Sequence, residues 1–178
     1  MLNNINLKAL EEYTNVITEK PLEAISSYGI IASWKGGVET EIKTLNQKVG
    51  SKEVFKNFVY TIGEPEELLG TNQNPTPQNY LLGGMAGCMM VGFVILATSK
   101  GIKLDNVELK IVGDLNLRGM LELDPNVSVG FEELNFQFEV KGSGTQQEYD
   151  EIIEHVQKIS PNYRTISDAV KISANRIM

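Results

Sequence analysis

The chain has 178 residues, of which 42% are apolar and 22% charged, and its net charge is −7 at pH 7. This length and composition predict a globular protein with a core of its own. The acidic balance argues against a general nucleic-acid binder and against adhesion to anionic membranes, because both need a cationic face. A single cysteine, Cys88, and a single histidine, His155, exclude an intramolecular disulfide and a structural zinc site built from four cysteines or from two cysteines and two histidines.

The N-terminal region predicts one helix followed by three strands. Apolar residues recur at helical spacing over residues 6–19, up to Pro21, and indicate an amphipathic helix without the core of a signal peptide. We therefore expect a cytoplasmic protein. Alternating patterns then predict strands at Tyr28–Trp34, Val38–Leu45 and Phe55–Ile62, with a turn at Gly36-Gly37.

The segment from Pro77 to Ser99 contains no charged residue and predicts one long helix. Thr76 suits the N-cap, Pro77 the first helical position and Gly101 the C-terminal stop. Its length alone would permit a membrane span. The polar start and the glycines favour a helix buried in a soluble core instead, with close approach by another helix or another subunit.

The strand period returns after Gly101. Apolar residues of one parity predict strands over 107–117 and 134–140, and Thr145-Gln-Gln-Glu148 predicts a capping box that opens a helix over 146–159. Ser160-Pro161 ends this helix, and residues 170–174 alternate like a closing strand. This order of elements predicts an α+β fold without a phosphate-binding βαβ unit.

One motif connects the sequence to a known family. The run Asn74-Pro-Thr-Pro-Gln-Asn-Tyr-Leu-Leu-Gly-Gly-Met-Ala-Gly-Cys88 resembles the central-helix motif of the OsmC/Ohr family, the osmotically inducible and organic hydroperoxide resistance proteins of bacteria. Residues 64–70, 100–102, 113–119 and 160–163 agree with the family in similar order, so the resemblance covers about residues 28–175.

The resemblance implies an OsmC-like α+β fold, in which a long buried central helix packs on curved antiparallel sheets and two chains form an intertwined homodimer. It predicts a single domain over residues 26–178, preceded by a helical extension over residues 1–25. The implied family activity is the reduction of organic hydroperoxides by a peroxidatic cysteine. In the family an arginine–glutamate pair activates this cysteine, a second cysteine forms a disulfide with it, and dithiols reduce the enzyme again. No cofactor is implied.

The match identifies candidate site residues and several departures from the family. Cys88 matches the peroxidatic cysteine, Gln78 occupies the position of the glutamate, and Ser160 stands where the second cysteine would fall. No arginine precedes Arg118, so Lys35 is the candidate for the activating cation. Tyr163, in the Ser-Pro-Asn-Tyr segment, is a candidate hydroxyl donor to Cys88; the alternative is a half-buried turn residue. The other cations left open for activation are Lys43, Lys52, Lys56, Arg118 and Arg164.

Two functional hypotheses follow. The first is a one-cysteine thiol peroxidase, in which Cys88 reduces a small apolar hydroperoxide and an external thiol completes the cycle. The second is a non-catalytic binder of an apolar or lipid-like ligand, in which Cys88 only packs as a small apolar side chain. The residues Met85, Met89 and Met90 fill core gaps or line an apolar pocket rather than bind copper, and His155 belongs to a solvated face.

Overall fold

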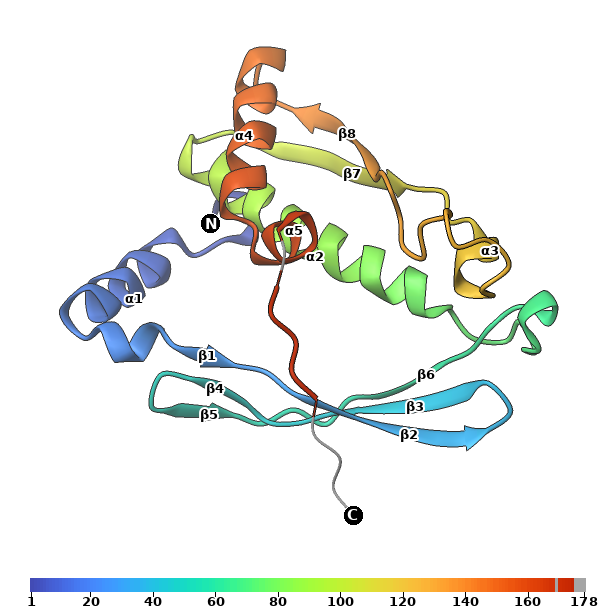
Figure 1. The fold of residues 1–178 in the computed structure, drawn as a ribbon. Coiled ribbons are helices and arrows are strands. Elements are labelled where there is room, and N and C mark those ends of the chain that lie inside the picture. Colours follow the sequence, from blue (N-terminus) through green and yellow to red (C-terminus); the bar gives the residue numbers. More distant parts are fainter. Residues whose placement is uncertain (169, 175–178) are drawn as a thin grey trace. The chain divides into compact units, whose positions relative to one another are not determined.

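The computed structural model describes residues 1–168 and 170–174, which divide into two compact units. We call residues 6–81 the sheet unit, and residues 1–5 together with the chain from residue 82 onward the core unit. The central helix α2 (Pro77–Ser99) begins in the sheet unit and continues through the core unit. The element labels are those of Figure 1. The sequence-based boundary at residue 25 stays a prediction.

The sheet unit contains one helix and two small antiparallel sheets. Its sheets have the strand orders β2-β3-β6 and β1-β4-β5. Its elements are α1 (Leu7–Glu19), a 3-10 turn (Pro21–Ala24), β1 (Ser26–Ser27), β2 (Ile30–Gly36), β3 (Glu39–Thr44), β4 (Gln47–Val49), β5 (Lys52–Val54), β6 (Val59–Ile62) and a 3-10 turn (Glu66–Leu68).

Local sequence explains the predicted parts of this unit. Asn6 caps α1, since its side chain accepts a hydrogen bond from the amide of Ala9 at 3.2 Å. Gly36 and Gly37 have positive φ (120° and 52°), which lets the chain reverse between β2 and β3. The predicted helix and strands are present, with strand ends shifted by up to four residues. The third strand is shorter than predicted, and the sheet of β1, β4 and β5 was not predicted.

The register gives the larger sheet two different faces. Ala32 pairs with Ile42, which in turn pairs with Tyr60, so these side chains share one face with Ile30 and Trp34. Serine, lysine and glutamate side chains, with Ile31 and Val59, occupy the other face. Most of the apolar face is exposed, because only Ile42 among its members is buried.

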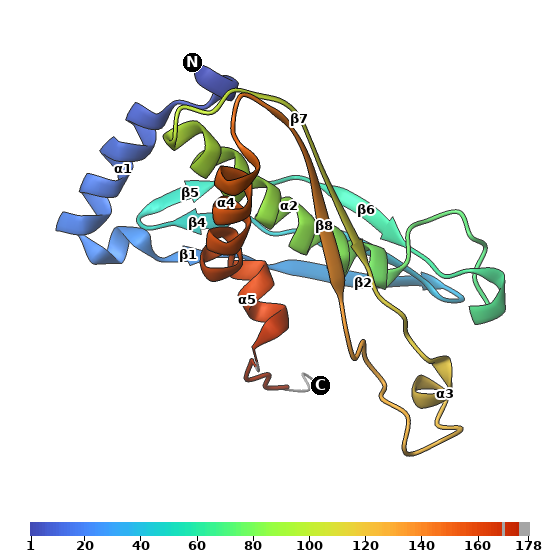
Figure 2. The same ribbon diagram turned by 90° about the horizontal axis from the view of Figure 1, so that it is seen from above.

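In the core unit, α2 packs against a β-hairpin and a pair of helices (Figure 1). Its elements are a 3-10 turn (Leu2–Asn4), the larger part of α2, β7 (Leu104–Val112), α3 (Leu117–Met120), β8 (Asn135–Gly142), α4 (Gln146–Ile159) and α5 (Pro161–Ser167). The long connection between β7 and β8 carries α3 at the far end of the hairpin (Figure 2).

One stripe of α2 forms the centre of the core. Met85, Met89, Phe93 and Ala97 recur at every fourth residue and are buried. They cluster with buried Tyr149, Ile152 and Val156 and with half-buried residues of β7 and β8. In the hairpin Val107 pairs with Val140, Leu109 with Phe138 and Ile111 with Phe136. Both predicted strands are present, but the first ends at Val112 and not at residue 117, because Leu117 opens the short helix α3.

The C-terminus of α2 and the N-terminus of α4 follow the expected capping chemistry. At the C-terminus of α2, Gly101 has a φ of 77°, and the amide of Ile102 donates to the carbonyl of Ala97 at 2.9 Å, which is a Schellman arrangement. At the start of α4, Thr145 and Glu148 form the predicted capping box. The α+β fold class is confirmed.

Three features differ from the sequence-based picture or qualify it. The closing strand predicted over residues 170–174 is wrong, since these residues have no regular structure and Val170 and Ile172 are exposed without a neighbouring strand. Ser160-Pro161 ends α4 as predicted but also opens α5. By length and composition, helix α2 could cross a membrane, but the core helices of soluble proteins meet the same weak criterion. The buried stripe of α2 shows that it is a core helix here.

Candidate functional site

The candidate nucleophile Cys88 lies three turns after the start of α2 and is half-buried. Gly84, Cys88 and Gly92 follow each other at every fourth residue and therefore share one face of the helix. A Cβ placed on Gly84 would lie 3.5 Å from Nδ2 of Asn162, and one on Gly92 would lie 3.6 Å from Cγ2 of Val156. The Cys88 face of α2 is therefore the face that packs against α4 and α5.

The junction between α4 and α5 is built by Ser160 and Pro161. Ser160 caps α5 and accepts a hydrogen bond from the amide of Tyr163 at 3.4 Å, while Pro161 occupies the first helical position. Asn162 then donates from Nδ2 to the carbonyl of Gly84 at 2.8 Å. This bond anchors α5 on α2 one turn before Cys88. Nothing in the sequence singled out Asn162, because its role depends on a carbonyl 78 residues earlier in the chain.

Tyr163 lies in α5 and packs its ring edge-on against Phe136, with the centroids 6.2 Å apart. Its hydroxyl donates to Oε1 of Gln157 at 3.2 Å. The residue is half-buried as one alternative predicted, but it lies in a helix rather than a turn. In this structure the hydroxyl of Tyr163 donates its hydrogen to Gln157 and not to Cys88. The role of Tyr163 as a donor to Cys88 stays a prediction.

Gln78 and Lys35 belong to the sheet unit. Gln78 lies in the first turn of α2, ten residues before Cys88, which corresponds to roughly 15 Å of helical rise. Lys35 follows Trp34 near the end of β2, and its Nζ lies 2.9 Å from Oε1 of Glu41 in the neighbouring strand. Both residues keep the roles assigned from the sequence only as predictions.

Two arginines of the core unit are engaged in ion pairs near the surface. Arg118 lies 2.9 Å from the carboxylate of Asp124, and Arg164 lies 2.7 Å from that of Asp168, one turn further along the chain. His155 is exposed on α4, which agrees with the solvated face predicted for it. Met85 and Met89 are buried in the core, as expected for side chains that fill gaps.

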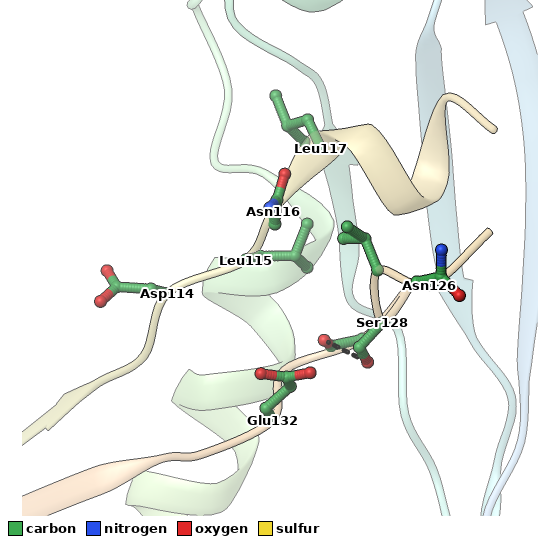
Figure 3. A pocket seen from close by; sticks show the side chains of 9 residues that line it. Asp114, Leu115, Asn116, Leu117, Asn126, Ser128 and Glu132 are labelled. Carbon is green, nitrogen blue, oxygen red and sulfur yellow. Dashed lines mark hydrogen bonds between the residues drawn. The ribbon is translucent and has the colours of Figure 1, made fainter. Parts of the chain in front are cut away.

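A polar hollow lies apart from Cys88, in the connection between β7 and β8 (Figure 3). It has a volume of about 690 Å³ and is lined by Asp114, Leu115, Asn116, Leu117, Asn126, Val127, Ser128, Gly130 and Glu132. The described residues bring no three His, Cys, Asp or Glu side chains together as metal ligands, here or elsewhere. The lining contains no thiol or imidazole, so the hollow lacks a nucleophile of the kind that Cys88 supplies.

The geometry limits the chemistry of the candidate site to that of one thiol. Cys88 is half-buried on α2, and the α4–α5 junction packs on the same face of this helix. Such a site can take a two-electron oxidation at sulfur, but the chain cannot form the disulfide that would follow, because it has no other cysteine.

Comparisons with known proteins support this description of the fold. An OsmC-like protein of Mycoplasma pneumoniae is 20% identical, with coverage of 79% of this chain and 87% of that one and a TM-score of 0.60. An OsmC-like protein of unknown function from Vibrio cholerae is 13% identical, with coverage of 79% and 94% and a TM-score of 0.61. At these identities the likeness establishes the shared fold. No curated protein matches the sequence.

The family model described as OsmC-like protein matches residues 70–175, which include α2, both strands of the hairpin, α4 and α5. This stretch is more than half of the chain and contains Cys88 with the helices that pack on its face. The resemblance predicted from the sequence is confirmed, and the chain belongs to the OsmC-like protein family.

Proposed function

We propose that this protein is a thiol-dependent redox protein that reduces organic hydroperoxides through Cys88. The observation that carries the proposal is the position of Cys88, the chain's one thiol, half-buried on the central helix of an OsmC-like fold and opposite the α4–α5 junction. A small apolar hydroperoxide is the substrate class that suits this position, because Met85, Met89 and Val156 of the adjoining core are apolar.

The oxidation step balances with the thiol alone. The thiolate of Cys88 attacks the terminal oxygen of the hydroperoxide, an S–O bond forms and the O–O bond breaks. The leaving alkoxide takes up a proton and departs as an alcohol. The sulfur has lost two electrons and is left as a sulfenic acid, while the peroxide has been reduced. The predicted roles of Lys35 and Gln78 are to favour the thiolate by charge and by hydrogen bonding.

The reduction step needs an external thiol, which the proposal includes as a partner. A first thiol condenses with the sulfenic acid, releases water and forms a mixed disulfide with Cys88. A second thiol attacks the sulfur of the first, releases Cys88 as a thiol and leaves as part of an external disulfide. Two thiols are thus oxidised for each hydroperoxide reduced.

The proposal includes a homodimer in the bacterial cytoplasm. A Cβ placed on Gly83 or Gly87 of α2 would have no neighbour within 4 Å among the described residues, and Val91, one turn further, is exposed. The apolar face of the larger sheet is exposed as well. Both surfaces suit contact with a second copy, which would remove their apolar side chains from water.

A second candidate function is the binding of an apolar or lipid-like ligand without catalysis. A groove of about 490 Å³ on the sheet unit favours it, with Tyr28, Ile30, Leu45 and Phe58 among its lining residues. The replacements at the family's functional positions, Gln78 and Ser160, point the same way. This candidate predicts a ligand that co-purifies with the protein and a Cys88 no faster than a free cysteine.

The deciding experiment follows cumene hydroperoxide consumption with excess dithiol by wild type and by Cys88→Ser. We expect rapid consumption by wild type, trapping of a sulfenic acid on it by dimedone, and a background rate for Cys88→Ser. A matched control is Met90→Leu, a change of similar volume at a half-buried neighbour, which should stay active. Equal rates for wild type and Cys88→Ser would refute the proposal.

A further inference from the structure

A groove on the sheet unit lies where its two small sheets meet. Along the chain β1 leads into β2, β3 into β4 and β5 into β6, so three short segments connect one sheet to the other (Figure 1). The groove has a volume of about 490 Å³, which is within the range of small-molecule sites. Each connection contributes residues to its lining: Tyr28 and Ile30, Thr44 and Leu45, and Lys56 and Phe58.

The apolar part of the groove is a row of side chains that runs across the strands. Ile30 pairs with Thr44 in the register of the larger sheet. The amide of Thr44 donates to the carbonyl of Phe58, and the amide of Phe58 donates to Oγ1 of Thr44, both at 3.0 Å. Ile30 and Phe58 therefore share one face of the sheet, and both are more than half exposed. Leu45 joins them beside Gly29, where an added Cβ would lie 3.0 Å from Cδ1 of Leu45.

Lys56 is the one charged side chain among the described residues that line the groove. It is half-buried, although Phe55 and Asn57 on either side of it are exposed. None of the ion pairs among residues 1–168 and 170–174 includes it. The side chain of Asn46 accepts from the Lys56 amide at 3.1 Å and donates to Oε1 of Glu53 at 2.9 Å. The backbone of Lys56 is thus held in place, and its ammonium group is left for a ligand.

The charge of this groove is opposite to the charge of the chain, which is −7. It is also opposite to that of the hollow between β7 and β8, which is lined by Asp114 and Glu132. A cation beside an apolar surface attracts an anionic group that carries an apolar part. Of these two cavities, the groove is therefore the one that suits an anion.

The strand order separates the cation from the far end of the apolar row. Because β3 lies between β2 and β6, and β4 between β1 and β5, the connection with Lys56 is at one edge and the connection with Tyr28 is at the other. Two strand spacings separate these edges, which is roughly 10 Å. The groove thus has a charged end and an apolar surface that extends away from it.

We propose that this groove binds an anionic amphiphile, an aliphatic chain that ends in a carboxylate. The carboxylate lies on the ammonium group of Lys56, and the chain extends across the middle strands towards Tyr28. The inference rests on the second candidate function and deepens it, because it names the class of ligand and the residue that selects it. The chain leaves water against Ile30, Leu45 and Phe58, and the carboxylate gains a charge-assisted hydrogen bond. An uncharged chain of the same length gains only the first contribution.

A lysine also covers apolar surface with its own stem, which would explain the half-burial of Lys56 without any ligand. Lys56→Met separates the two roles, because methionine keeps an unbranched apolar stem and lacks the charge. The matched control is Lys43→Met. It removes the same charge from the same sheet, but the Lys43 side chain lies on the opposite, polar face, where its residue pairs with Ile31 and Val59.

The first test measures the binding of decanoate and of 1-decanol to the full chain by isothermal titration calorimetry. We expect decanoate to bind wild type in a one-to-one ratio and more tightly than decanol. Lys56→Met should weaken decanoate binding by on the order of fivefold, the effect of a half-exposed ion pair, and leave decanol binding unchanged. Lys43→Met should bind both ligands as wild type does. Equal affinities of wild type for the two ligands, or equal losses in the two variants, would overturn the inference.

The second test places the ligand in the groove. Phe58→Ala should weaken the binding of both ligands by on the order of tenfold, because it removes apolar contact area. Val59→Ala changes the next residue, on the opposite face of the sheet, and should bind both ligands as wild type does. Unchanged decanoate binding in Phe58→Ala contradicts the inference.

The outcomes also separate this inference from the function on which it rests. If decanol and decanoate bind equally well and both depend on Phe58, the inference is wrong and the second candidate function stands. If neither ligand binds, both are rejected. Cys88→Ser should bind decanoate as wild type does, since the groove needs no thiol, and a loss of binding in this variant would place the ligand at Cys88 and overturn the inference.

Discussion

The two units of this chain both contain paired strands but have very different cores. Among the described residues, eight of the nine buried apolar side chains belong to the core unit, and Ile42 alone belongs to the sheet unit. In the sheet unit, by contrast, Trp34 is 77% exposed and Phe58 is 62% exposed. Strand pairing thus accompanies burial in one unit and occurs almost without it in the other.

This difference shows that strands can pair without burying their apolar side chains within the same unit. Hydrogen bonds and the Gly36-Gly37 turn set the register of β2 and β3, whereas hydrophobic burial supplies most of the favourable free energy of folding. A sheet with an exposed apolar face can gain further burial from a partner. The proposed second copy would supply the missing burial.

The largest expected effect is on the core unit. Phe93→Ala should lower the free energy of unfolding by about 3–5 kcal/mol, because the ring is fully buried and stacks on Phe138 with a centroid distance of 4.9 Å. Urea unfolding followed by circular dichroism measures this loss. Phe58→Ala, which removes an exposed ring from the sheet unit, should cost far less at the same low protein concentration. Similar losses in the two variants would contradict the contrast between the units.

The next effect concerns association through the sheet unit. Ile30→Lys introduces a charge into the apolar face of the larger sheet, so we expect a shift from dimer to monomer in light scattering. Ile31→Lys is the matched control, because the side chain lies on the same strand but on the opposite, polar face. A dimer that survives Ile30→Lys but dissociates in Ile31→Lys would place the interface on the wrong face.

The sequence predicted the elements that depend on local chemistry. Helix α1, helix α2 and helix α4 begin at capping residues and end at a proline, a glycine or a Ser-Pro pair that could be identified directly. The Ser160-Pro161 pair also shows the limit of such signals. Serine followed by proline suits both the end of one helix and the start of the next, so α5 was missed.

Elements that depend on distant contacts could not be predicted in the same way. The alternation of residues 170–174 is typical of a strand, but no neighbouring strand pairs with it in the described part of the chain. At the candidate site the resemblance identified Cys88, Ser160 and Tyr163, but the contacts of Gly84 with Asn162 and of Gly92 with Val156 appear only in the structure. These contacts span more than sixty residues of sequence, as the residue numbers show.

A smaller effect tests how the first residues of the chain are held. The Asn3 side chain donates to Oγ1 of Thr98 at 2.9 Å and to the carbonyl of Ile102 at 2.8 Å, and it accepts from the amide of Leu104 at 2.9 Å. We expect Asn3→Ala to lower the free energy of unfolding by about 1–3 kcal/mol, since these partners lose their bonds. A loss of this size would support the assignment of residues 1–5 to the core unit.

The control for this prediction is Asn4→Ala. Asn3 and Asn4 both have positive φ (48° and 58°), so alanine is strained to a similar degree at either position, while Asn4 is exposed. The difference between the two variants in urea unfolding therefore reports the hydrogen bonds alone. Equal losses would mean that Asn3 contributes only its backbone conformation.

The smallest effect is a dependence of core-unit stability on pH through Glu148. The backbone amide of Thr145, and then its hydroxyl, donate to this carboxylate at 2.7 and 2.9 Å and lower the pKa of Glu148 from its usual value of 4.5. A carboxyl group whose pKa is lower in the folded than in the unfolded chain stabilises the fold above about pH 4.5, and this contribution disappears as the pH falls through the folded-state value. Between about pH 6 and about pH 3, the urea midpoint of Glu148→Gln should therefore fall less than that of wild type. The control Glu154→Gln removes an exposed carboxylate from the same helix, and its urea midpoint should depend on pH as that of wild type does. A weaker pH dependence in this control would assign the effect to the general charge of α4 and not to its capping box.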